Sequence, residues 1–414
     1  MNAEIIAIGS ELLTPLRTDT NSLFLTEQLN RIGVDVVFKT VVGDEKTRLT
    51  ATVSLALQRS EIILTIGGLG PTGDDLTREC VAAALGRPLR RDEALVGPME
   101  ARFRARGLRM PEINLRQTMV IEGATVLPNR NGTAPGLWIE EQGKIIILLP
   151  GPPRELCPLF EHGCLPRLRE RVPPTVIRTR ELRLTGLTES ATEERIAPLY
   201  TRYKNPVTTI LATLGEIQIH LKSFGKDEAE AQAPLDELSP QLEKVLGKHV
   251  FSTRSESMEE VAGNCLLRNK ATVAVAESCT GGLLAQRLTS VSGSSAYFLG
   301  GVVCYSNAVK MDWLDVPAEV LGTHGAVSAA VAQALAEGIR QRAKSTFGMG
   351  ITGIAGPTGG TSEKPVGLVY LALAGGGQTQ VHERRYPGER KAIRWQATQS
   401  ALDILRRVLM EEER

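Results

Sequence analysis

Hydrophobic and polar residues follow two alternating patterns along residues 1–170, and each pattern predicts a different kind of element. Short runs rich in Ile and Val, typical of buried strands, are separated by segments with apolar residues at helical spacing. The predicted strands are Ile5–Ile8, Val34–Val42, Ile62–Ile66 and Ile145–Leu149, and the predicted helices are Thr20–Arg31 and Arg48–Gln58. This alternation indicates βαβ units, and we therefore expect a three-layer α/β domain with a mostly parallel sheet.

Residues 171–252 have the pattern of a smaller α+β module. A strand at Arg178–Thr185 is followed by a helix at Ser190–Tyr200, a hairpin, and a charged helix at Lys226–Leu246. The strands of the hairpin are Val207–Leu214 and Glu216–Phe224, joined at Gly215. This order predicts a ferredoxin-like or KH-type module. An RNA-binding KH module needs a basic GxxG loop, and the nearest candidate, Gly186–Glu189, ends in glutamate. The pattern therefore favours a spacer or dimerisation element over a nucleic-acid reader.

Residues 253–414 again combine strands with amphipathic helices, which predicts a C-terminal α/β domain. We expect helices at Met258–Leu267, at Ala326–Ala343 and from about Glu389, and an apolar stretch at Tyr297–Cys304. The predicted strands are Ala271–Val275, Gly348–Thr352, Val366–Ala374 and Gln380–Tyr386. The chain is thus predicted to contain three domains, at residues 1–170, 171–252 and 253–414.

The stretch Ala276–Gly282, which reads AESCTGG, lies between a predicted strand and a predicted helix. A strand that ends in small polar residues before a helix places hydroxyls and backbone N–H groups at the edge of a sheet. A nucleophile can lie there beside donors for a developing negative charge. The alternative is an ordinary strand–turn–helix in which Ser278 is the N-cap.

Four loops in residues 1–170 follow predicted strands and carry unusual residues: GSELL (Gly9–Leu13), GGLGPTGDD (Gly67–Asp75), PNRNGTAPG (Pro128–Gly136) and LPGPPREL (Leu149–Leu156). Ligands bind at this edge of open α/β sheets. In the second loop, Gly67, Gly68 and Gly70 allow positive φ, and their N–H groups suit a phosphate. Asp74 and Asp75 suit a metal, or alternatively cap the next helix. Together the loops favour a phosphate-bearing ligand.

The amino-acid composition of the chain argues against several classes of function. The 414 residues carry a net charge of +1, which gives no bulk electrostatic case for binding nucleic acid or an acidic membrane. The longest apolar runs, such as Ile145–Leu149, are far below the roughly 20 residues of a membrane span. The N-terminus lacks a basic region, so we expect no signal peptide. The 6 cysteines and 5 histidines are scattered, which predicts a reduced cytoplasmic protein without a His/Cys zinc site.

Five motifs in the C-terminal domain resemble those of a known enzyme domain. In order they are AESCTGG, YSNAVK, THGAVS, TGIAGPTGG with KPVG, and GERKAIRWQA. They resemble the CinA C-terminal domain, a nicotinamide-nucleotide amidohydrolase (PncC) domain. The N-terminal loops resemble the molybdopterin-binding-like domain of molybdenum-cofactor biosynthesis proteins, which precedes a KH-type module in CinA proteins. The whole chain therefore resembles the CinA family of competence/damage-inducible proteins.

This resemblance implies hydrolysis of nicotinamide mononucleotide to nicotinate mononucleotide and ammonia, in pyridine-nucleotide salvage. It makes Ser278 the nucleophile and Lys310 its base, with Tyr305 and Thr352 assisting orientation and proton transfer. It places Arg390 at the substrate phosphate. The other implied substrate-binding residues are Thr280, Gly281, Gly282, Asn307, Gly353 and Gly356. Lys310 is a base only when neutral, and we expect burial beside Val303 and Met311, with Arg390 nearby, to lower its pKa.

For the N-terminal domain the resemblance implies a nucleotide site. Its expected residues are Gly9, Glu11, Gly67, Gly68, Gly70, Thr72, Pro150 and Gly151, with Asp74 and Asp75 as metal ligands. The deamidase is expected to need no cofactor, whereas ADP-ribose hydrolysis in the N-terminal domain would use a divalent metal. The expected partners are small nucleotides, namely nicotinamide mononucleotide and ADP-ribose, and a second copy of the chain in a homodimer, with no membrane or direct nucleic-acid contact.

Two alternatives to the deamidase stay open. The first is a metal-dependent ADP-ribose pyrophosphatase in the N-terminal domain, alone or as a second activity. The second is a non-enzymatic binding module for molybdopterin or for a competence or recombination partner. Intact Ser278 and Lys310 favour the deamidase, and Asp74 and Asp75 keep the pyrophosphatase open.

Overall fold

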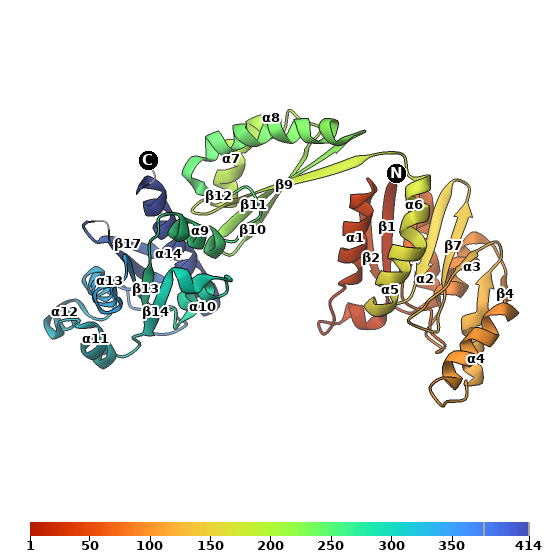
Figure 1. Cartoon of the computed structure of the whole chain (residues 1–414), viewed down its shortest axis with the longest axis horizontal. Coiled ribbons are helices and arrows are strands. Elements are labelled where there is room, and N and C mark those ends of the chain that lie inside the picture. The colour runs from red at the N-terminus through yellow and green to blue at the C-terminus, as the bar shows by residue number, and fades with distance from the viewer. Residues whose placement is uncertain (376, 413–414) are drawn as a thin grey trace. The chain divides into compact units, whose positions relative to one another are not determined.

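The computed structural model describes residues 1–375 and 377–412, and the chain divides into two compact units (Figure 1). Unit 1 contains Met1–Arg178 with Phe224–Gln232, and unit 2 contains Thr179–Ser223 with Ala233–Arg414. Because this division runs through the middle module, the boundaries expected after residues 170 and 252 stay predictions.

Unit 1 is built on a six-stranded sheet with the order β2-β1-β3-β8-β7-β6. Its strands are β1 (Asn2–Ile8), β2 (Asp35–Val42), β3 (Ile62–Ile66), β6 (Thr125–Leu127), β7 (Gly136–Glu141) and β8 (Lys144–Leu149). The first four strands in the sheet order pair in parallel, and β7 is antiparallel to both β8 and β6. A separate two-stranded ladder joins β4 (Leu89–Arg91) and β5 (Met119–Ile121). The sheet is thus mostly parallel, as predicted.

Helices cover both faces of this sheet. They are α1 (Asn21–Arg31), α2 (Lys46–Arg59), α3 (Thr77–Leu85), α5 (Pro153–Leu159) and α6 (Leu165–Arg171), with one π-helical turn, η4 (Phe160–Cys164), between α5 and α6. Helix α4 (Val96–Arg104) packs instead against the short turn η2 (Glu93–Leu95). Successive side chains of a strand point to opposite faces. Ile5 therefore packs with α1, α5 and α6, whereas Ile6 packs with α2 and α3. Both clusters are fully buried, which accounts for the continuous Ile and Val runs in the strands.

The middle module forms a four-stranded sheet with the order β10-β11-β9-β12. Its elements are β9 (Val176–Leu184), α7 (Glu189–Tyr200), β10 (Val207–Thr213), β11 (Glu216–Gly225), α8 (Glu228–Leu246), the short η5 (Gly247–His249) and β12 (Val250–Ser252). The hairpin of β10 and β11 turns near Gly215, as predicted. The sequence pattern missed β12, because three residues are too short to show strand periodicity.

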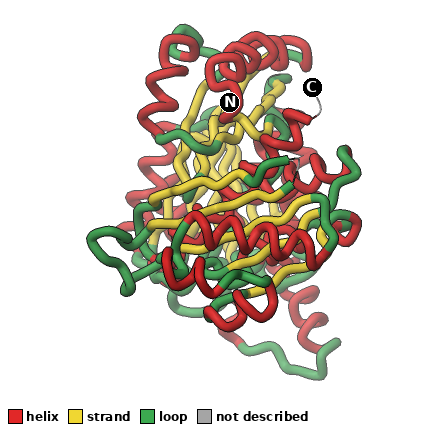
Figure 2. The backbone as a smooth tube through the Cα atoms, turned by 90° about the vertical axis from the view of Figure 1, so that its left-hand side faces the viewer, coloured by secondary structure: helices red, strands yellow, loops and turns green. Residues whose placement is uncertain are grey.

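The C-terminal domain has a five-stranded sheet with the order β14-β13-β15-β16-β17. Its strands are β13 (Val273–Glu277), β14 (Phe298–Val303), β15 (Phe347–Gly353), β16 (Leu368–Ala374) and β17 (Gln380–Arg385). Its helices are α9 (Met258–Arg268), α10 (Leu283–Thr289), α11 (Asn307–Leu314), α12 (Ala318–His324), α13 (Ala329–Ala343) and α14 (Arg390–Glu412). One face packs against α9, α10 and α14, and the other packs against α11 and α13. The strands and the helices that cover them are distinguished by colour in Figure 2.

Glycines in β15 set how closely α13 approaches the sheet. A Cβ at Gly348 would lie 2.1 Å from the Ala336 carbonyl oxygen, and a Cβ at Gly350 would lie 2.4 Å from that of Ala332. Side chains at these positions would push the helix away, so the alternation of glycine with Met349 and Ile351 keeps large residues on the opposite face.

The fold class predicted from the sequence is confirmed, while several helices and strands begin or end at other residues than predicted. The strand expected at Ala271–Val275 runs from Val273 to Glu277, and the helix expected from Ala326 begins at Ala329 after the Ser328 N-cap. Helix α11, which carries Lys310, was not predicted from the sequence pattern. Within the described residues no helix is long and apolar enough to span a membrane.

Candidate active site

Three parallel strands bring the C-terminal candidate residues to one edge of the sheet. Strand β13 lies between β14 and β15 and is parallel to both, so the carboxyl ends of all three strands meet. The Ser278 N–H donates to the Ile351 carbonyl oxygen at 2.9 Å, and the Cys304 N–H donates to that of Glu277 at 2.8 Å. Ser278, Thr352 and Cys304 therefore lie at neighbouring strand ends, where open α/β sheets place ligands.

Ser278 is not a helix N-cap, which excludes the alternative interpretation of the AESCTGG stretch. The N-cap of α10 is Gly282, at φ +91°. The buried Glu277 carboxylate instead accepts hydrogen bonds from the N–H groups of Gly282 (3.1 Å), Leu284 (3.0 Å) and Ala285 (2.8 Å). Glu277 thus satisfies the first turn of α10, leaving the half-buried Ser278 hydroxyl free of a capping role. It also means that these helical N–H groups do not face a substrate.

Lys310 reaches Ser278 from the second turn of α11. The Ser306 side chain caps this helix by accepting from the Val309 N–H at 3.2 Å. Lys310 is only 1% exposed. Its Nζ donates to the carbonyl oxygens of Cys304 at 2.7 Å and Tyr305 at 3.2 Å, and it lies 3.4 Å from Ser278 Oγ. The structure therefore places the predicted base beside the predicted nucleophile.

Burial lowers the pKa of Lys310 below its ordinary value. The other groups that act on it, Cys304, Cys279 and Tyr305, oppose this shift. The expected causes were only partly right: Val303 is 50% exposed, and Arg390 is not among the groups that shift the pKa. Burial of the amine at the strand ends therefore lowers the pKa, without the help of a neighbouring cation.

Thr352 and Gly353 end β15 beside the nucleophile. Thr352 is buried, and its hydroxyl donates to the Ala326 carbonyl oxygen at 2.7 Å. Lys364 holds the same segment, because its Nζ donates to the His324 and Val327 carbonyl oxygens, each at 2.8 Å. Residues of the THGAVS and KPVG motifs thus support the site. Sequence reasoning had recognised both motifs without assigning them this role.

Tyr305 and Asn307 follow β14 and have exposed side chains, that of Tyr305 being 64% exposed. Only the Tyr305 backbone contacts Lys310. Both residues are close to Lys310 in the sequence, and within the described part of the chain neither side chain forms a hydrogen bond with Ser278 or Lys310.

Helix α14 brings two arginines to this edge. The Arg390 Nη1 donates to the Gly356 carbonyl oxygen at 2.8 Å, and the exposed side chain of Arg390 continues into solvent. Arg394, one turn further, donates from Nε (3.1 Å) and Nη2 (2.5 Å) to the Thr280 carbonyl oxygen. Its Nη2 also lies 3.4 Å from the position of a Cβ at Gly281. Arg394 was not among the predicted site residues, although its spacing of four from Arg390 could have indicated it.

Thr280 has unused hydrogen-bonding groups next to the nucleophile. It is fully buried, and its Oγ1 has no hydrogen-bond partner within the described chain. Its N–H also makes no hydrogen bond to another described residue. A buried unpaired polar group is costly and calls for an explanation, such as a bound ligand or water.

The predicted N-terminal residues also converge. The strand-end loops of unit 1 surround a cavity of about 390 Å³. Its lining includes every residue predicted for the nucleotide and metal site: Gly9, Glu11, Gly67, Gly68, Gly70, Thr72, Asp74, Asp75, Pro150 and Gly151. The lining carboxylates are Glu11, Asp44, Asp74, Asp75 and Glu155, and no Lys, Arg or His lines the cavity.

Asp75 organises the Gly67–Asp75 loop instead of capping α3. Its carboxylate accepts from the N–H groups of Gly70 and Thr72, each at 2.8 Å, and from the Thr72 hydroxyl at 2.5 Å. Those N–H groups are therefore not available to a phosphate. Gly67 and Gly68 have positive φ, as expected, but Gly70 does not. Gly70 is required because a Cβ there would lie 2.3 Å from Asp75 Oδ2.

The carboxylates of this cavity fit a metal site that substrate phosphates and water complete. Within the described residues, no group of three or more His, Cys, Asp or Glu side chains could hold a metal by itself. A Mg²⁺ ion is commonly held by one or two carboxylates together with substrate phosphates and water. Asp74 suits this role, because hydrogen bonding to Thr72 lowers its pKa and its side chain is exposed.

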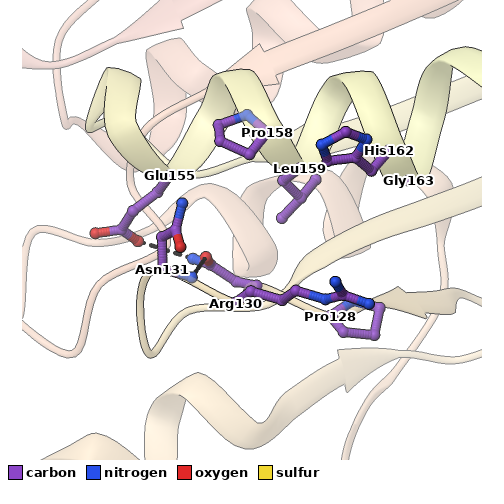
Figure 3. Close-up of a pocket in the computed structure, with 9 residues that line it drawn as sticks. Pro128, Arg130, Asn131, Glu155, Pro158, Leu159, His162 and Gly163 are labelled. Atoms are coloured by element: carbon purple, nitrogen blue, oxygen red, sulfur yellow. Dashed lines mark hydrogen bonds between the residues drawn. The ribbon is translucent and has the colours of Figure 1, made fainter.

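A second cavity of about 570 Å³ adjoins the first through their shared residue Glu155. In Figure 3, Pro128 and Arg130 of the loop face Pro158 and His162 across it. Asn129 lines the second cavity and bonds two residues that line the first: its Nδ2 donates to Glu155 Oε2 at 2.8 Å and to the Ala134 carbonyl oxygen at 2.9 Å. The π-helical turn η4 borders this second cavity.

Comparison with known proteins matches three family models along the chain. They describe a probable molybdopterin binding domain at residues 4–170, the damage-inducible protein CinA KH domain at residues 179–252, and the CinA C-terminal domain at residues 255–409. A CinA-like protein of Koribacter versatilis is 54% identical over 414 residues, covering 99% of this chain and 100% of that protein. A putative competence-damage inducible protein of Desulforudis audaxviator is 44% identical, covering 99% of each chain.

Among solved structures, the competence/damage inducible protein CihA of Agrobacterium tumefaciens is 40% identical. The match covers 38% of this chain and 99% of that one, with a TM-score of 0.36.

Proposed function

The chain belongs to the CinA family, and from that premise we propose that its C-terminal domain hydrolyses the carboxamide of nicotinamide mononucleotide to give nicotinate mononucleotide and ammonia. The proposal depends on one observation above all: a buried lysine amine lies 3.4 Å from the Ser278 hydroxyl. An unactivated serine is a poor nucleophile, and a neutral lysine is one of the bases that can activate it.

The contacts of Lys310 suit the neutral amine. A neutral amine has two N–H bonds and one lone pair. The two N–H bonds are satisfied by the carbonyl oxygens of Cys304 and Tyr305, so the lone pair is left for the Ser278 hydroxyl proton. The lowered pKa of Lys310 favours this neutral form.

In the proposed reaction, Ser278 Oγ attacks the carboxamide carbon while its proton passes to Lys310 Nζ. Lys310 then gives this proton to the leaving nitrogen, the C–N bond breaks, and ammonia departs. Water attacks the resulting ester, with Lys310 accepting its proton and returning it to Ser278 Oγ. The unpaired N–H of Thr280 is the donor that we assign to the developing oxyanion.

The two arginines of α14 suit a nucleotide substrate in different ways. Arg390 makes one backbone hydrogen bond and keeps its remaining N–H groups toward solvent, so we assign it to the substrate phosphate. Arg394 is committed to the Thr280 carbonyl oxygen and acts as a positioning residue for the Thr280–Gly282 turn.

We propose a second activity for unit 1: hydrolysis of a phosphate-bearing nucleotide such as ADP-ribose with a divalent cation. The supporting observation is the cavity lined by five carboxylates and no basic residue, which would repel a pyrophosphate unless a cation neutralised it. The cation would supply that neutralisation and polarise a phosphoryl oxygen, and Asp74 is the carboxylate that we assign to it.

One experiment separates these functions. Purified protein is incubated with nicotinamide mononucleotide or with ADP-ribose, with and without a chelator, while ammonia and AMP are measured. We expect ammonia release that is insensitive to the chelator and AMP release that the chelator abolishes. If neither product forms, both proposals are wrong and a non-enzymatic binding role is favoured.

A further inference from the structure

A further cavity, of about 530 Å³, lies in unit 2, and the proposed reaction does not use it. It lies between the middle module and the C-terminal domain, and it is lined by residues of η5, β17 and α14. None of the residues that we assign to the deamidase lines it. Its charged and titratable residues are Lys248, His249, His382, Arg384, Asp403 and Arg407.

Positive charge in this cavity exceeds negative charge. Asp403 is the lining carboxylate, and its Oδ2 lies 2.8 Å from Arg407 Nε. Its Oδ1 accepts from Nε (3.0 Å) and Nη2 (2.7 Å) of the buried Arg406. One carboxylate is therefore shared by two guanidinium groups, and Lys248 and Arg384 have no lining carboxylate left to balance them. The whole chain carries a net charge of only +1, so this concentration of positive charge is local.

Two imidazole rings in the cavity have nitrogen atoms without a protein partner. His249 Nδ1 lies 3.1 Å from the Thr185 carbonyl oxygen. Because a carbonyl can only accept, Nδ1 carries the proton and Nε2 is left for a ligand. His382 Nε2 is buried and makes no hydrogen bond within the described chain. A buried nitrogen that lacks a partner next to uncompensated cations indicates that an anion belongs there.

Burial and the surrounding cations lower the pKa of both imidazole rings. Burial is the largest cause that lowers the pKa of His382, followed by Arg384 and Arg407. Burial, Arg407 and Arg195 also lower the pKa of His249, against opposite effects of the Thr185 carbonyl and Asp403. An anion that entered would reverse this balance, because each ring could then take up a proton and donate to it.

The backbone keeps the space in front of these groups open. Gly186, at φ +77°, borders the cavity, and a Cβ there would lie 3.5 Å from His249 Nδ1 and 3.8 Å from Arg407 Nη2. Gly186 begins the stretch that was the nearest match to a KH-type GxxG loop. Here the first residue of that stretch borders a basic cavity, in a module without a basic GxxG loop of its own.

We propose that this cavity binds a ligand with two or more linked phosphate groups, either a free oligophosphate or the oligophosphate of a nucleotide. Its volume is in the range of small-molecule sites. Arginine forks and protonated imidazoles are suitable donors for phosphate oxygens. A concave cavity of this volume, as opposed to a basic stripe along the surface, favours a small ligand over a nucleic-acid strand. Because both modules line the cavity, the ligand would hold them together.

Calorimetric titration of the full-length protein tests this proposal, with tripolyphosphate, ATP and a ten-nucleotide RNA as the probes. We expect tripolyphosphate and ATP to bind, and Arg384→Gln to weaken the binding about tenfold. Equal affinities would assign the site to the oligophosphate group itself, and tighter ATP binding would assign it to a nucleotide. Arg385→Gln is the matched control, because Arg385 is the next residue of β17, points to the opposite face, and pairs with Glu383 at 3.4 Å.

A second measurement keeps the test independent of any single variant. Between pH 6 and pH 8 the affinity for tripolyphosphate should fall, since the two imidazoles lose the protons that the anion stabilises. The charged groups that face the two rings are Lys248, Arg195, Arg384, Arg407 and Asp403. The proposal is wrong if neither polyphosphate binds, if Arg385→Gln weakens binding as much as Arg384→Gln does, or if the RNA binds more tightly than tripolyphosphate through Arg384.

Discussion

The amine of Lys310 shows how a single buried group can determine the chemistry of a site. Two backbone carbonyl oxygens and the Ser278 hydroxyl surround it, and no carboxylate is among the groups that act on its pKa. A lysine with a carboxylate partner would be held in its charged form and could not accept a proton. Burial without such a partner is therefore the feature that makes Lys310 suitable as a base.

The first prediction concerns the pH dependence of the deamidase. Because burial lowers the pKa of Lys310, the neutral base is present above that pKa and is lost as the pH falls through it. The rate at saturating substrate should thus rise with pH through an apparent pKa well below the value of about 10.4 for a free lysine. Lys310→Arg should be inactive at every pH up to 10, because a guanidinium does not lose its proton. A pH-independent rate, or an active arginine variant, would exclude Lys310 as the base.

At the scale of single residues, the sequence predicted which side chains pair better than it predicted what shifts the pKa of Lys310. The resemblance of the motifs to the CinA C-terminal domain paired Ser278 with Lys310, and the structure places the Lys310 amine 3.4 Å from the Ser278 hydroxyl. The cause of the pKa shift is the burial of the Lys310 amine, which depends on tertiary packing that no sequence pattern shows. The same limit applies to Arg394: its contact with the Thr280 carbonyl depends on how a helix more than a hundred residues away packs on the turn.

At the scale of elements, one carboxylate holds the turn that carries the nucleophile. Glu277 is 1% exposed and accepts from three N–H groups at the start of α10. Glu277→Gln replaces one acceptor oxygen with an amide that faces the same donors. We predict that it lowers the free energy of unfolding by about 2 kcal/mol. The measurement is denaturant unfolding followed by tryptophan fluorescence.

Glu260→Gln is a matched control for this substitution. Glu260 also accepts an N–H at the start of a helix, that of Ser257 at 2.7 Å, but its side chain is exposed. Glu260→Gln should lower the free energy of unfolding by less than about 1 kcal/mol. If the two substitutions have equal effects, the buried carboxylate of Glu277 does not stabilise the turn in the way described here.

The two neighbouring aspartates of the Gly67–Asp75 loop should behave differently. Asp75 accepts three hydrogen bonds from its own loop, so Asp75→Asn should destabilise unit 1 as well as reduce any activity there. Asp74→Asn should leave stability within about 0.5 kcal/mol of the parent and still abolish the chelator-sensitive release of AMP from ADP-ribose. Melting temperature and AMP release are measured for each variant. An Asp74→Asn protein with full AMP release would exclude Asp74 as the metal ligand.

The elements themselves were largely predictable, because buried strands and amphipathic helices repeat at different periods. Four strand-end loops of unit 1 were expected at one edge of the sheet, and β6, although short, runs parallel to β8 and brings Pro128–Gly136 there. The antiparallel strand β7 was missed, since its residues Gly136–Glu141 are hidden between two glycine-containing turns. The role of Asp75 was also missed, because a carboxylate before a helix is by itself the signature of a cap.

At the scale of the whole molecule, the C-terminal domain has contacts with the middle module that its chemistry does not need. The buried Arg406 donates to the carbonyl oxygens of Lys248 at 2.8 Å and Val250 at 3.2 Å. A fragment of residues 253–414 loses both acceptors while it keeps Ser278, Lys310 and the arginines of α14. We predict that it releases ammonia without added metal but melts at a lower temperature than unit 2 of the full chain. Complete loss of activity in a folded fragment would show that the deamidase site needs the rest of the chain.

The central claim is that Ser278 and Lys310 act as one unit, and a double-mutant cycle on ammonia release tests it most directly. Lys310→Met should lower the turnover of nicotinamide mononucleotide by roughly 10²-fold or more, and Ser278→Ala should be at least as severe. The double variant should be little worse than the worse single variant, because groups that act together lose their effect together. Ser278→Ala should still bind the substrate, since Arg390 remains. Near-normal turnover by Ser278→Ala, or losses that multiply in the double variant, would contradict the mechanism.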